Sequence, residues 1–428
     1  MRDQSAVLPG DARGERSFAA ERLLAPSQAI CTYFARVEIA PPPVERVALG
    51  AAAGRVLASD AIAREDHPSH ARSTMDGFAI LSGGGARRTI VGEVRMGTAA
   101  PHAIDANQAL RIPTGGALPD GADAVIPIED VDLEGETIVM RAKVAAGENL
   151  TQRAADLRAG ECVLAAGRRL GAPELGVLAT LGCATVEVFA RPRFGIISTG
   201  DELIDVAATP SLGQIRDSNR YAIGAALAAL GAEPVQLPRV CDDADALRDA
   251  LRAALEGCDA VVLTGGSSVG ERDLTPQIVA ELGPPGPIVH GVRVKPGKPT
   301  LLGAIGSKPV IGLPGNPASA LMILEAVARP IVAACVGVTN DAPLTIDAIA
   351  DKPFRGREGW TWFVPARVRN AGGRLLAEPL PLRSSHVSLL ARAAGYVTLG
   401  ETAPNVEAGE SVRVTLFSSG GAPIERSP

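Results

Sequence analysis

The hydrophobic pattern of the chain is most regular between residues 191 and 338. Short apolar runs of strand length, such as FGIIST, DAVVLTGG and PVIGLPG, alternate there with longer stretches such as DADALRDALRAALEGC, whose apolar residues recur every three or four positions. This alternation is typical of a parallel sheet that is covered by helices on both faces. We therefore predict a parallel α/β domain over residues 191–338.

The segments on either side of this region have a different pattern. Between residues 63 and 147 the apolar runs are short, as in FAIL, RTIVGEV and DAVIPIE, and Gly, Pro and Asp separate them. Residues 339–428 again contain short runs, among them WTWFVPARV and ESVRVTLF. Short strands between turn residues predict a small β domain in each segment, the second folded as a barrel or a sandwich. Residues 1–27 are polar and weakly periodic, so we expect a disordered tail there.

The totals argue against several classes of protein. The 428 residues carry a net charge of −6 and no basic block, which argues against nucleic acid as a partner. No apolar run approaches the ~20 residues that span a bilayer, and the N-terminus lacks the apolar stretch of a signal peptide. We therefore expect a cytoplasmic protein without a membrane partner. The six cysteines include no CxxC pair, so we interpret them as small buried hydrophobic side chains.

Glycine and polar residues follow the predicted strands at their carboxyl ends, where ligands bind in an open parallel sheet. These residues are Gly265, Gly266 and Ser267 after one strand, and Pro314, Gly315, Asn316 and Pro317 after another. The glycines leave the backbone open to a close ligand, and Asn316 is the expected N-cap of the next helix. Lys295 and Lys298 flank a Pro-Gly turn nearby in the sequence. A Gly-Gly pair can simply turn a strand into a loop, and lysines can simply be solvated, but their grouping favours an anion site.

Carboxylates are expected at the same edge and need a separate explanation. Glu202, Asp217 and Asp273 would repel a phosphate that is held by the lysines. Magnesium removes this conflict, because it prefers one or two carboxylates together with phosphate oxygens and water. The edge therefore predicts a phosphate-bearing ligand with Mg²⁺, whereas Asp201 is interpreted as a surface or helix-terminal acid.

The motifs in this region, and several outside it, together resemble a known family. They are TGDEL, DSN, TGGSSVGERD, KPGKP and GLPGNPAS between residues 199 and 319, preceded by STMDGFA, PTGGALPDGADAVIPIED and GENLTQRAADLRAG. This set resembles the MoeA family of molybdopterin molybdenumtransferases, which includes the E domain of gephyrin. Order and spacing match from about residue 29 to residue 415.

The resemblance implies an elongated four-part subunit. Its parts would be a discontinuous linker domain (28–62 and 148–190), the β domain, a molybdopterin-binding α/β domain and the C-terminal β domain. It also implies a homodimer whose cleft combines the α/β domain of one subunit with the β domain of the other. The family reaction inserts molybdate into adenylylated molybdopterin and releases AMP with the help of Mg²⁺, as the last step of molybdenum cofactor biosynthesis. Implied partners are the adenylyltransferase of the pathway and the recipient molybdoenzymes.

The resemblance also assigns expected roles to single residues. Those matched to catalytic positions are Asp273, Glu202, Asp156, Lys295 and Lys298, with Glu202 and Asp273 as the metal ligands. Those matched to substrate contacts are Thr114, Gly265, Gly266, Ser267, Asp217, Asn219, Pro314, Gly315, Asn316, Pro317 and Ser385. His386 follows Ser385 and is expected to face the cleft, whereas His67 and His70 are interpreted as loop residues.

Two departures from the family pattern leave the activity open. The family motif usually reads DNSAMDGYA, but this chain has Ala71 and Arg72 in place of the Asp and Asn, and Ala155 stands where the family has Glu. In one interpretation the chain is an active insertase in which Asp76 or Asp156 takes over the missing role. In the other it is a paralogue that binds molybdopterin or a nucleotide as a carrier or in a related pathway. Asp76 is either a turn former or a site residue.

Overall fold

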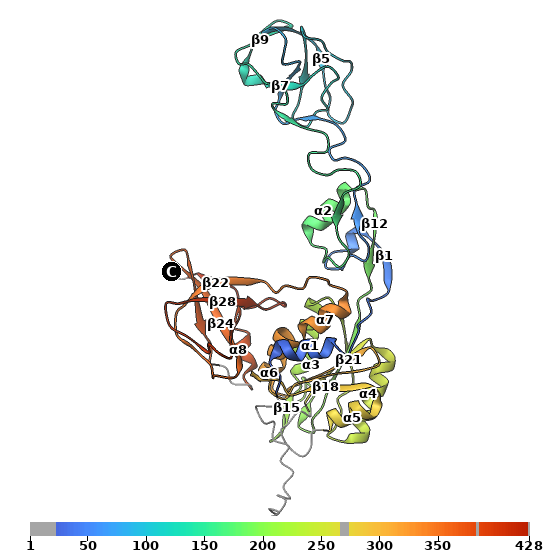
Figure 1. Cartoon of the computed structure of the whole chain (residues 1–428), viewed down its shortest axis with the longest axis vertical. Helices are drawn as coiled ribbons and strands as arrows, with labels where there is room; N and C mark the ends of the chain where they lie inside the picture. Colours follow the sequence, from blue (N-terminus) through green and yellow to red (C-terminus); the bar gives the residue numbers. More distant parts are fainter. Residues whose placement is uncertain (1–22, 266–273, 382–384, 427–428) are drawn as a thin grey trace, which may run out of the picture.

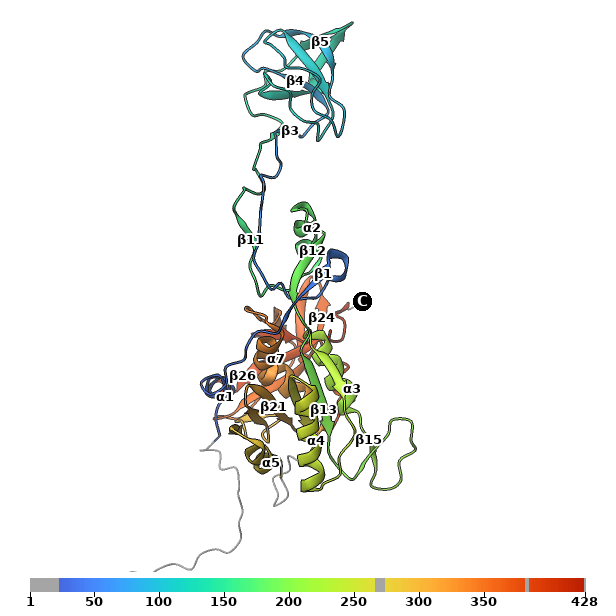
Figure 2. The ribbon, with the colours of Figure 1, turned by 90° about the vertical axis from the view of Figure 1, so that its right-hand side faces the viewer.

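The computed structural model describes residues 23–265, 274–381 and 385–426. The chain is elongated (Figure 1): a β domain lies at one end, a linker domain lies in the middle, and the α/β domain and a C-terminal β domain lie side by side at the other end. Figure 2 shows the chain passing twice through a narrow connection between the linker domain and the β domain. The predicted four-part architecture is confirmed.

The α/β domain is built on a six-stranded sheet in the order β16-β13-β17-β21-β20-β18. Its strands are β13 (Arg193–Ser198), β16 (Glu233–Gln236), β17 (Ala260–Thr264), β18 (Pro285–His290), β20 (Leu301–Ile305) and β21 (Lys308–Leu313). The first four strands in this order are parallel, but β20 and β18 are antiparallel to their neighbours. The expectation of a wholly parallel sheet was therefore incomplete, because the two residues Gly306 and Ser307 join β20 and β21 as a hairpin.

Helices cover both faces of this sheet, as the alternating pattern predicted. They are α3 (Asn219–Ala229), α4 (Ala244–Gly257), α5 (Thr275–Leu282), α6 (Pro317–Ile323), the π-helical turn η4 (Leu324–Ala328) and α7 (Arg329–Val336). Helix α4 shows why these segments pack on the sheet as helices. Its buried residues Leu247, Leu251 and Ala254 form one stripe, and their spacing matches the helical period. The Asp243 carboxylate caps its start by accepting a 2.8 Å hydrogen bond from the Ala246 N–H.

The ordered N-terminal part begins earlier than the predicted boundary. Helix α1 (Pro26–Phe34) buries Ala29 and Tyr33 in the same core as Phe194 of the α/β sheet, and Leu24 pairs with Val292. The expectation that residues up to 27 form a disordered tail is thus wrong for residues 23–27, and α1 packs its buried face into the core of the α/β domain. Leu23, at 5% exposure, anchors this segment by apolar burial.

The run from α6 through α7, Pro317–Val336, is long and apolar enough to cross a membrane by length and composition alone. However, 72% of its apolar window is buried inside the protein. A buried core helix passes the same test, because its neighbours replace water around the whole circumference. Its Glu325 is also buried and accepts a 2.6 Å hydrogen bond from the Ser418 hydroxyl of the C-terminal domain.

The C-terminal domain is a small barrel. Its strands and helix are β22 (Thr345–Ala350), β23 (Phe354–Arg355), β24 (Thr361–Ala371), β25 (Arg374–Pro379), α8 (Val387–Leu390), β26 (Gly395–Leu399), β27 (Asn405–Val406), β28 (Ser411–Leu416) and β29 (Glu425–Arg426). Strands β24, β25, β22, β28 and β26 close on themselves, because β24 pairs with both β25 and β26. Closure leaves no free sheet edge among these strands.

The β domain and the linker domain complete the chain. The β domain contains a sheet in the order β7-β4-β6-β5-β9-β8. Its elements are β3 (Arg72–Ser73), β4 (Gly77–Ile80), β5 (Arg87–Glu93), β6 (Gln108–Ile112), β7 (Ala124–Pro127), η3 (Ile128–Asp130), β8 (Val131–Glu134), β9 (Thr137–Met140) and β10 (Leu150–Thr151). The linker elements are β1 (Val44–Ala48), η2 (Leu49–Ala51), β2 (Ala61–Ile62), β11 (Cys162–Leu164), α2 (Ala172–Thr180) and β12 (Thr185–Phe189).

The cysteines differ from the expectation. All six are free thiols, but only Cys258 and Cys335 are buried, so the interpretation of all six as buried hydrophobic side chains is wrong. Burial raises the pKa of the Cys335 thiol to about 12, because an apolar environment disfavours the thiolate. The others lie at least partly on the surface, where a small polarisable side chain is tolerated.

Candidate functional site

The ends of β13 and β17 form the first part of the candidate site. The Thr199 N–H donates to the Thr264 carbonyl oxygen at 2.8 Å, which ties the two loops together. Gly265 has a φ of +98°, and a Cβ built on it would lie 2.2 Å from the Thr199 carbonyl oxygen. Glycine is therefore required here both by the backbone conformation and by the close approach.

The loop that follows β21 meets the loops that follow β13 and β17. Gly315 lies against Gly265, since a Cβ on Gly315 would be 3.4 Å from the Gly265 Cα. The Asn219 side-chain amide donates to the Gly315 carbonyl oxygen at 2.8 Å. Pro314 is buried, Pro317 is partly buried, and Gly315 and Asn316 are exposed. The structure thus brings the predicted glycine loops together at one edge of the sheet.

Asn316 stands at the predicted N-cap position of α6. Its side chain, however, makes no capping hydrogen bond. The start of the helix is set instead by Pro317 at the first helical position, whose ring already fixes the required φ. The exposed Asn316 amide therefore remains available to a ligand at this edge.

The acids of this edge have different environments. Glu202 is exposed, and its carboxylate lies beside Gly200. Asp217 is only 2% exposed, accepts a 3.3 Å hydrogen bond from the Arg220 N–H, and lies 3.9 Å from the Arg220 guanidinium. Asp217 thus holds the start of α3 and presents almost no surface to solvent. Asp201 accepts a 3.1 Å hydrogen bond from the Asp242 N–H, which agrees with its interpretation as a surface acid.

The lysine turn, residues 295–299, is held by packing and hydrogen bonds. Gly297 has a φ of +103°, and a Cβ there would lie 2.2 Å from Cγ1 of Ile323 in α6. The Thr300 hydroxyl donates to the Gly297 carbonyl oxygen at 2.6 Å, and the Lys298 carbonyl oxygen accepts 2.9 Å hydrogen bonds from the N–H groups of Val292 and Thr300. Lys295 is exposed and Lys298 is partly buried. The backbone is therefore fixed, whereas the Lys295 ammonium is open to solvent.

A second group of predicted site residues lies in the β domain. The Asp76 carboxylate accepts hydrogen bonds from the Thr114 N–H at 2.7 Å and from the Thr114 hydroxyl at 2.8 Å. These two bonds hold the pKa of Asp76 below its usual range, because they stabilise the charged form. The Asp76 carboxylate therefore ties the segment before β4 to the loop after β6 and remains exposed, whereas its role as a site residue stays a prediction.

The altered motif lies close to this pair. Arg72 in β3 pairs with Thr151 of β10, and its side-chain Nε is buried without a hydrogen bond to any described residue. The Ala71 carbonyl oxygen accepts a 2.9 Å hydrogen bond from the Leu118 N–H, but its methyl side chain offers no ligand. Residues 71 and 72 therefore offer a guanidinium but no carboxylate.

The remaining predicted residues are scattered. Asp156 is exposed and its N–H donates to the His67 carbonyl oxygen at 3.1 Å. The His70 ring contacts the Ser69 hydroxyl at 3.0 Å. Ser385 and His386 are both exposed, just before α8. Three further predicted residues, Gly266, Ser267 and Asp273, lie outside the described residues.

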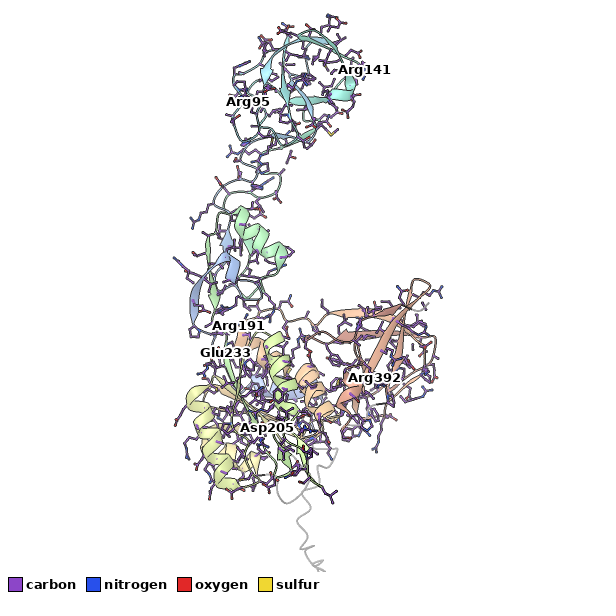
Figure 3. The ribbon with its side chains drawn as sticks, turned by 180° about the vertical axis from the view of Figure 1, so that it is seen from behind. Arg95, Arg141, Arg191, Asp205, Glu233 and Arg392 are labelled. Carbon is purple, nitrogen blue, oxygen red and sulfur yellow. The ribbon has the colours of Figure 1, made fainter. Side chains whose placement is uncertain are left out.

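Within one chain the two groups of site residues lie far apart. Figure 3 labels Arg95 in the β domain and Asp205 in the loop that follows β14 (Leu203–Ile204), and these lie at opposite ends of the molecule. The Asp76–Thr114 pair belongs to the first end, and the glycine loops and the lysine turn belong to the second. A single chain thus does not assemble all the predicted residues into one site.

Sequence reasoning missed one contact at this site. The Lys295 ammonium lies 4.7 Å from the centre of the Trp362 ring, so the C-terminal barrel contacts the lysine turn directly. The signal in the sequence was composition: the chain has only two tryptophans, and Trp360 and Trp362 stand two residues apart.

Comparison with known proteins covers nearly the whole chain. Residues 24–182 match the model of the MoeA N-terminal region (domains I and II), residues 195–334 that of a probable molybdopterin binding domain, and residues 347–417 that of the MoeA C-terminal region (domain IV). The chain is 32% identical over 388 residues to a molybdopterin molybdenumtransferase of Bacillus subtilis, covering 87% of this chain and 90% of that protein. The chain belongs to the MoeA family.

Further relatives agree with this membership. A molybdopterin molybdenumtransferase of Haemophilus influenzae is 31% identical over 385 residues, which cover 88% of this chain and 95% of that protein. The solved structure of a molybdopterin biosynthesis MoeA protein from Pyrococcus horikoshii superposes with a TM-score of 0.74 at 30% identity, over 92% of this chain and 99% of the other. The N-terminal match spans α1, the β domain and most of the linker domain, and the other two matches fall on the α/β domain and the barrel.

Proposed function

We propose that this chain is a molybdenum insertase, which transfers molybdate into adenylylated molybdopterin and releases AMP as the last step of molybdenum cofactor biosynthesis. The observation that carries the proposal is the similarity to molybdopterin molybdenumtransferases over 87% of the chain. The geometry of the sheet edge supports it, because three loops, two lysines and an exposed carboxylate gather where a parallel sheet binds ligands.

Each part of the edge has a physical task in this reaction. Gly265 and Gly315 leave the backbone open, so that a planar pterin or a phosphate can approach without meeting a Cβ. Lys295 and Lys298 supply positive charge for oxyanions, and a preformed cation stabilises the charge that develops on the departing phosphate. The fixed turn holds these lysines in position before the substrate arrives, which reduces the entropy cost of binding.

Magnesium fits this edge only as a partner of the substrate. Residues 23–265, 274–381 and 385–426 contain no cluster of three His, Cys, Asp or Glu side chains that would hold a metal ion by itself. Mg²⁺ commonly takes one or two carboxylates and completes its shell with phosphate oxygens and water. Glu202 is exposed and suits this role, and Asp273 is the second proposed ligand. When bound, the ion would neutralise charge on the phosphates of the substrate.

A homodimer is proposed as the functional unit. The Asp76–Thr114 pair and the lysine turn lie at opposite ends of one chain, so a second copy is needed to bring a β domain to an α/β edge. We expect light scattering to give a mass near twice 43.9 kDa at micromolar concentration. A mass near 43.9 kDa in the active preparation would contradict the shared cleft.

The proposed setting follows from the reaction. The substrate would come from the adenylyltransferase of the pathway, and the product would pass to recipient molybdoenzymes in the cytoplasm. These partners are inferred from the family alone.

A second candidate function is favoured by the altered motif. Ala71 has no carboxylate, and the Arg72 guanidinium next to it adds a positive charge. A paralogue with this motif would bind molybdopterin or a nucleotide tightly but would not turn it over. The acids and lysines that remain at the α/β edge favour the active insertase instead.

Release of AMP from adenylylated molybdopterin, with molybdate and Mg²⁺ supplied, distinguishes the two functions. We expect the natural chain to release AMP in a molybdate-dependent manner, because its cationic turn and Glu202 are in place. The Ala71→Asp variant is the matched comparison. Tight binding without release by the natural chain, together with activity in the variant, would contradict the insertase and support the carrier.

A further inference from the structure

The lysine turn is joined to the C-terminal barrel by a short strand. Strand β19 (Val294–Lys295) pairs with β24 in parallel, and Lys295 stands opposite Trp362. Residues that stand opposite each other in a ladder project to the same face. The Lys295 ammonium accordingly lies over the Trp362 ring at 4.7 Å from its centre. This distance is within the ~6 Å at which a cation and an aromatic ring attract each other.

The same junction is braced on both sides of this contact. The Thr361 N–H donates to the Arg293 carbonyl oxygen at 3.1 Å, and the Arg293 guanidinium forms a 2.8 Å ion pair with Glu401 in the loop after β26. Both side chains of the pair are about one-quarter exposed, at 25% and 27%, so solvent screens it less than a surface pair. The barrel therefore holds Trp362 in a fixed position relative to the lysine turn.

Both groups of the contact retain donors for a ligand. The Trp362 indole N–H is buried and donates no hydrogen bond within the described part of the chain. The Lys295 ammonium makes no hydrogen bond or ion pair with the described residues, apart from its contact with the ring. Indole N–H groups usually find an acceptor when they are buried. An ammonium ion resting on a ring has its remaining N–H bonds directed away from the ring, toward an acceptor of opposite charge.

We propose that Trp362 is a positioning residue for the oxyanion site, which holds the Lys295 ammonium in place to receive molybdate. The proposal rests on the proposed insertase function and adds to it a residue from the barrel. Lysine has four rotatable side-chain bonds, so a free Lys295 would lose considerable rotamer freedom each time it met an anion. The ring of Trp362 removes much of this freedom beforehand, and the affinity for the anion rises accordingly.

The test compares Trp362→Leu, which removes the ring, with Trp362→Phe, which keeps a ring but loses the N–H. We expect Trp362→Leu to raise the KM for molybdate about 3- to 30-fold, the range that corresponds to a partly desolvated cation–ring contact. The kcat at saturating molybdate should stay within about twofold, and the affinity for adenylylated molybdopterin should not change. Trp362→Phe should fall between Trp362→Leu and the natural chain, as expected from its weaker ring face.

Trp360→Phe is the matched control, because it removes an indole two residues away whose ring makes no cation–ring contact with Lys295 among the described residues. Its molybdate KM should equal that of the natural chain. A merely structural role for Trp362 would instead lower kcat and thermal stability while leaving the molybdate KM unchanged, and that result would overturn the proposal.

Calorimetric titration of Trp362→Leu with sodium molybdate, and separately with inorganic phosphate, shows for which oxyanion the affinity of the protein falls. Loss for phosphate alone would also overturn the assignment to molybdate.

A double-mutant cycle with Lys295→Ala makes the test specific. Trp362→Leu should have no further effect on the molybdate affinity when Lys295 is already alanine, and additive losses would contradict positioning through Lys295.

Failure of the proposed function is distinguishable from failure of this proposal. If the natural chain neither binds molybdate nor releases AMP, the insertase is rejected. If the natural chain does both and Trp362→Leu behaves identically, only the role of Trp362 is rejected.

Discussion

Replacing Lys295 with alanine is expected to slow AMP release by about two to three orders of magnitude, the usual cost of removing one preorganised charge from a site where charge develops. Lys295 is exposed on a turn whose backbone is fixed by Gly297 and Thr300, so the substitution removes the ammonium without removing a structural contact of the backbone. Lys298→Ala should have a similar effect. The measurement is the rate of AMP release at saturating adenylylated molybdopterin.

Lys352→Ala is the control for this prediction. This substitution also removes one positive charge, but Lys352 lies in the barrel, where its side chain is 62% exposed and forms a 2.6 Å ion pair with Glu378. Its substitution should leave the rate within about twofold, as expected for a surface pair. Equal rates of AMP release for the natural chain and Lys295→Ala would show that Lys295 does not take part in the reaction.

Gly265→Ala is expected to lower the free energy of unfolding of the α/β domain by about 2 to 4 kcal/mol. The new Cβ would lie 2.2 Å from the Thr199 carbonyl oxygen, which belongs to the backbone and cannot rotate away, and the φ of +98° is strained for alanine. The ends of β13 and β17 would have to separate, so binding of adenylylated molybdopterin should weaken as well. Thermal unfolding and binding titration measure the two effects.

The matched control for this substitution is Gly257→Ala. Gly257 is the last residue of α4, and nothing lies within 4 Å of a Cβ built on it. Alanine should therefore be neutral or slightly stabilising there, because it favours the helix. If Gly265→Ala unfolded at the same temperature as Gly257→Ala, the close packing of the two strand ends would be disproved.

The sequence was sufficient to predict which loops form the sheet edge. Parallel strands place their carboxyl ends together, so residues that follow β13, β17 and β21 were expected to meet, and Gly265 does lie against Gly315. The surroundings of each charge could not be predicted in this way. Asp217 is almost fully buried beside Arg220, and periodicity does not reveal whether a polar residue at a helix start faces solvent. Its contact with the substrate stays a prediction.

Contacts between domains could not be predicted in the same way. The pairing of β19 with β24 joins residues that are more than sixty positions apart in the sequence, and nothing in the local pattern of VKPGK or WTWFV identifies the partner. The antiparallel strand β20 was missed for a related reason: the hairpin turn Gly306-Ser307 resembles the loops that separate a strand from a helix. The distance between the β domain and the α/β domain likewise depends on the linker, which only the three-dimensional structure reveals.

The most direct test of the insertase is the amount of molybdenum transferred for each AMP released. Purified chain is incubated with adenylylated molybdopterin, molybdate and Mg²⁺, and AMP and pterin-bound molybdenum are then measured in the same samples. Insertion predicts that the two amounts rise together in a one-to-one ratio, and that AMP release is negligible when molybdate is omitted. AMP release that is independent of molybdate, or that yields no pterin-bound metal, would contradict the proposed function.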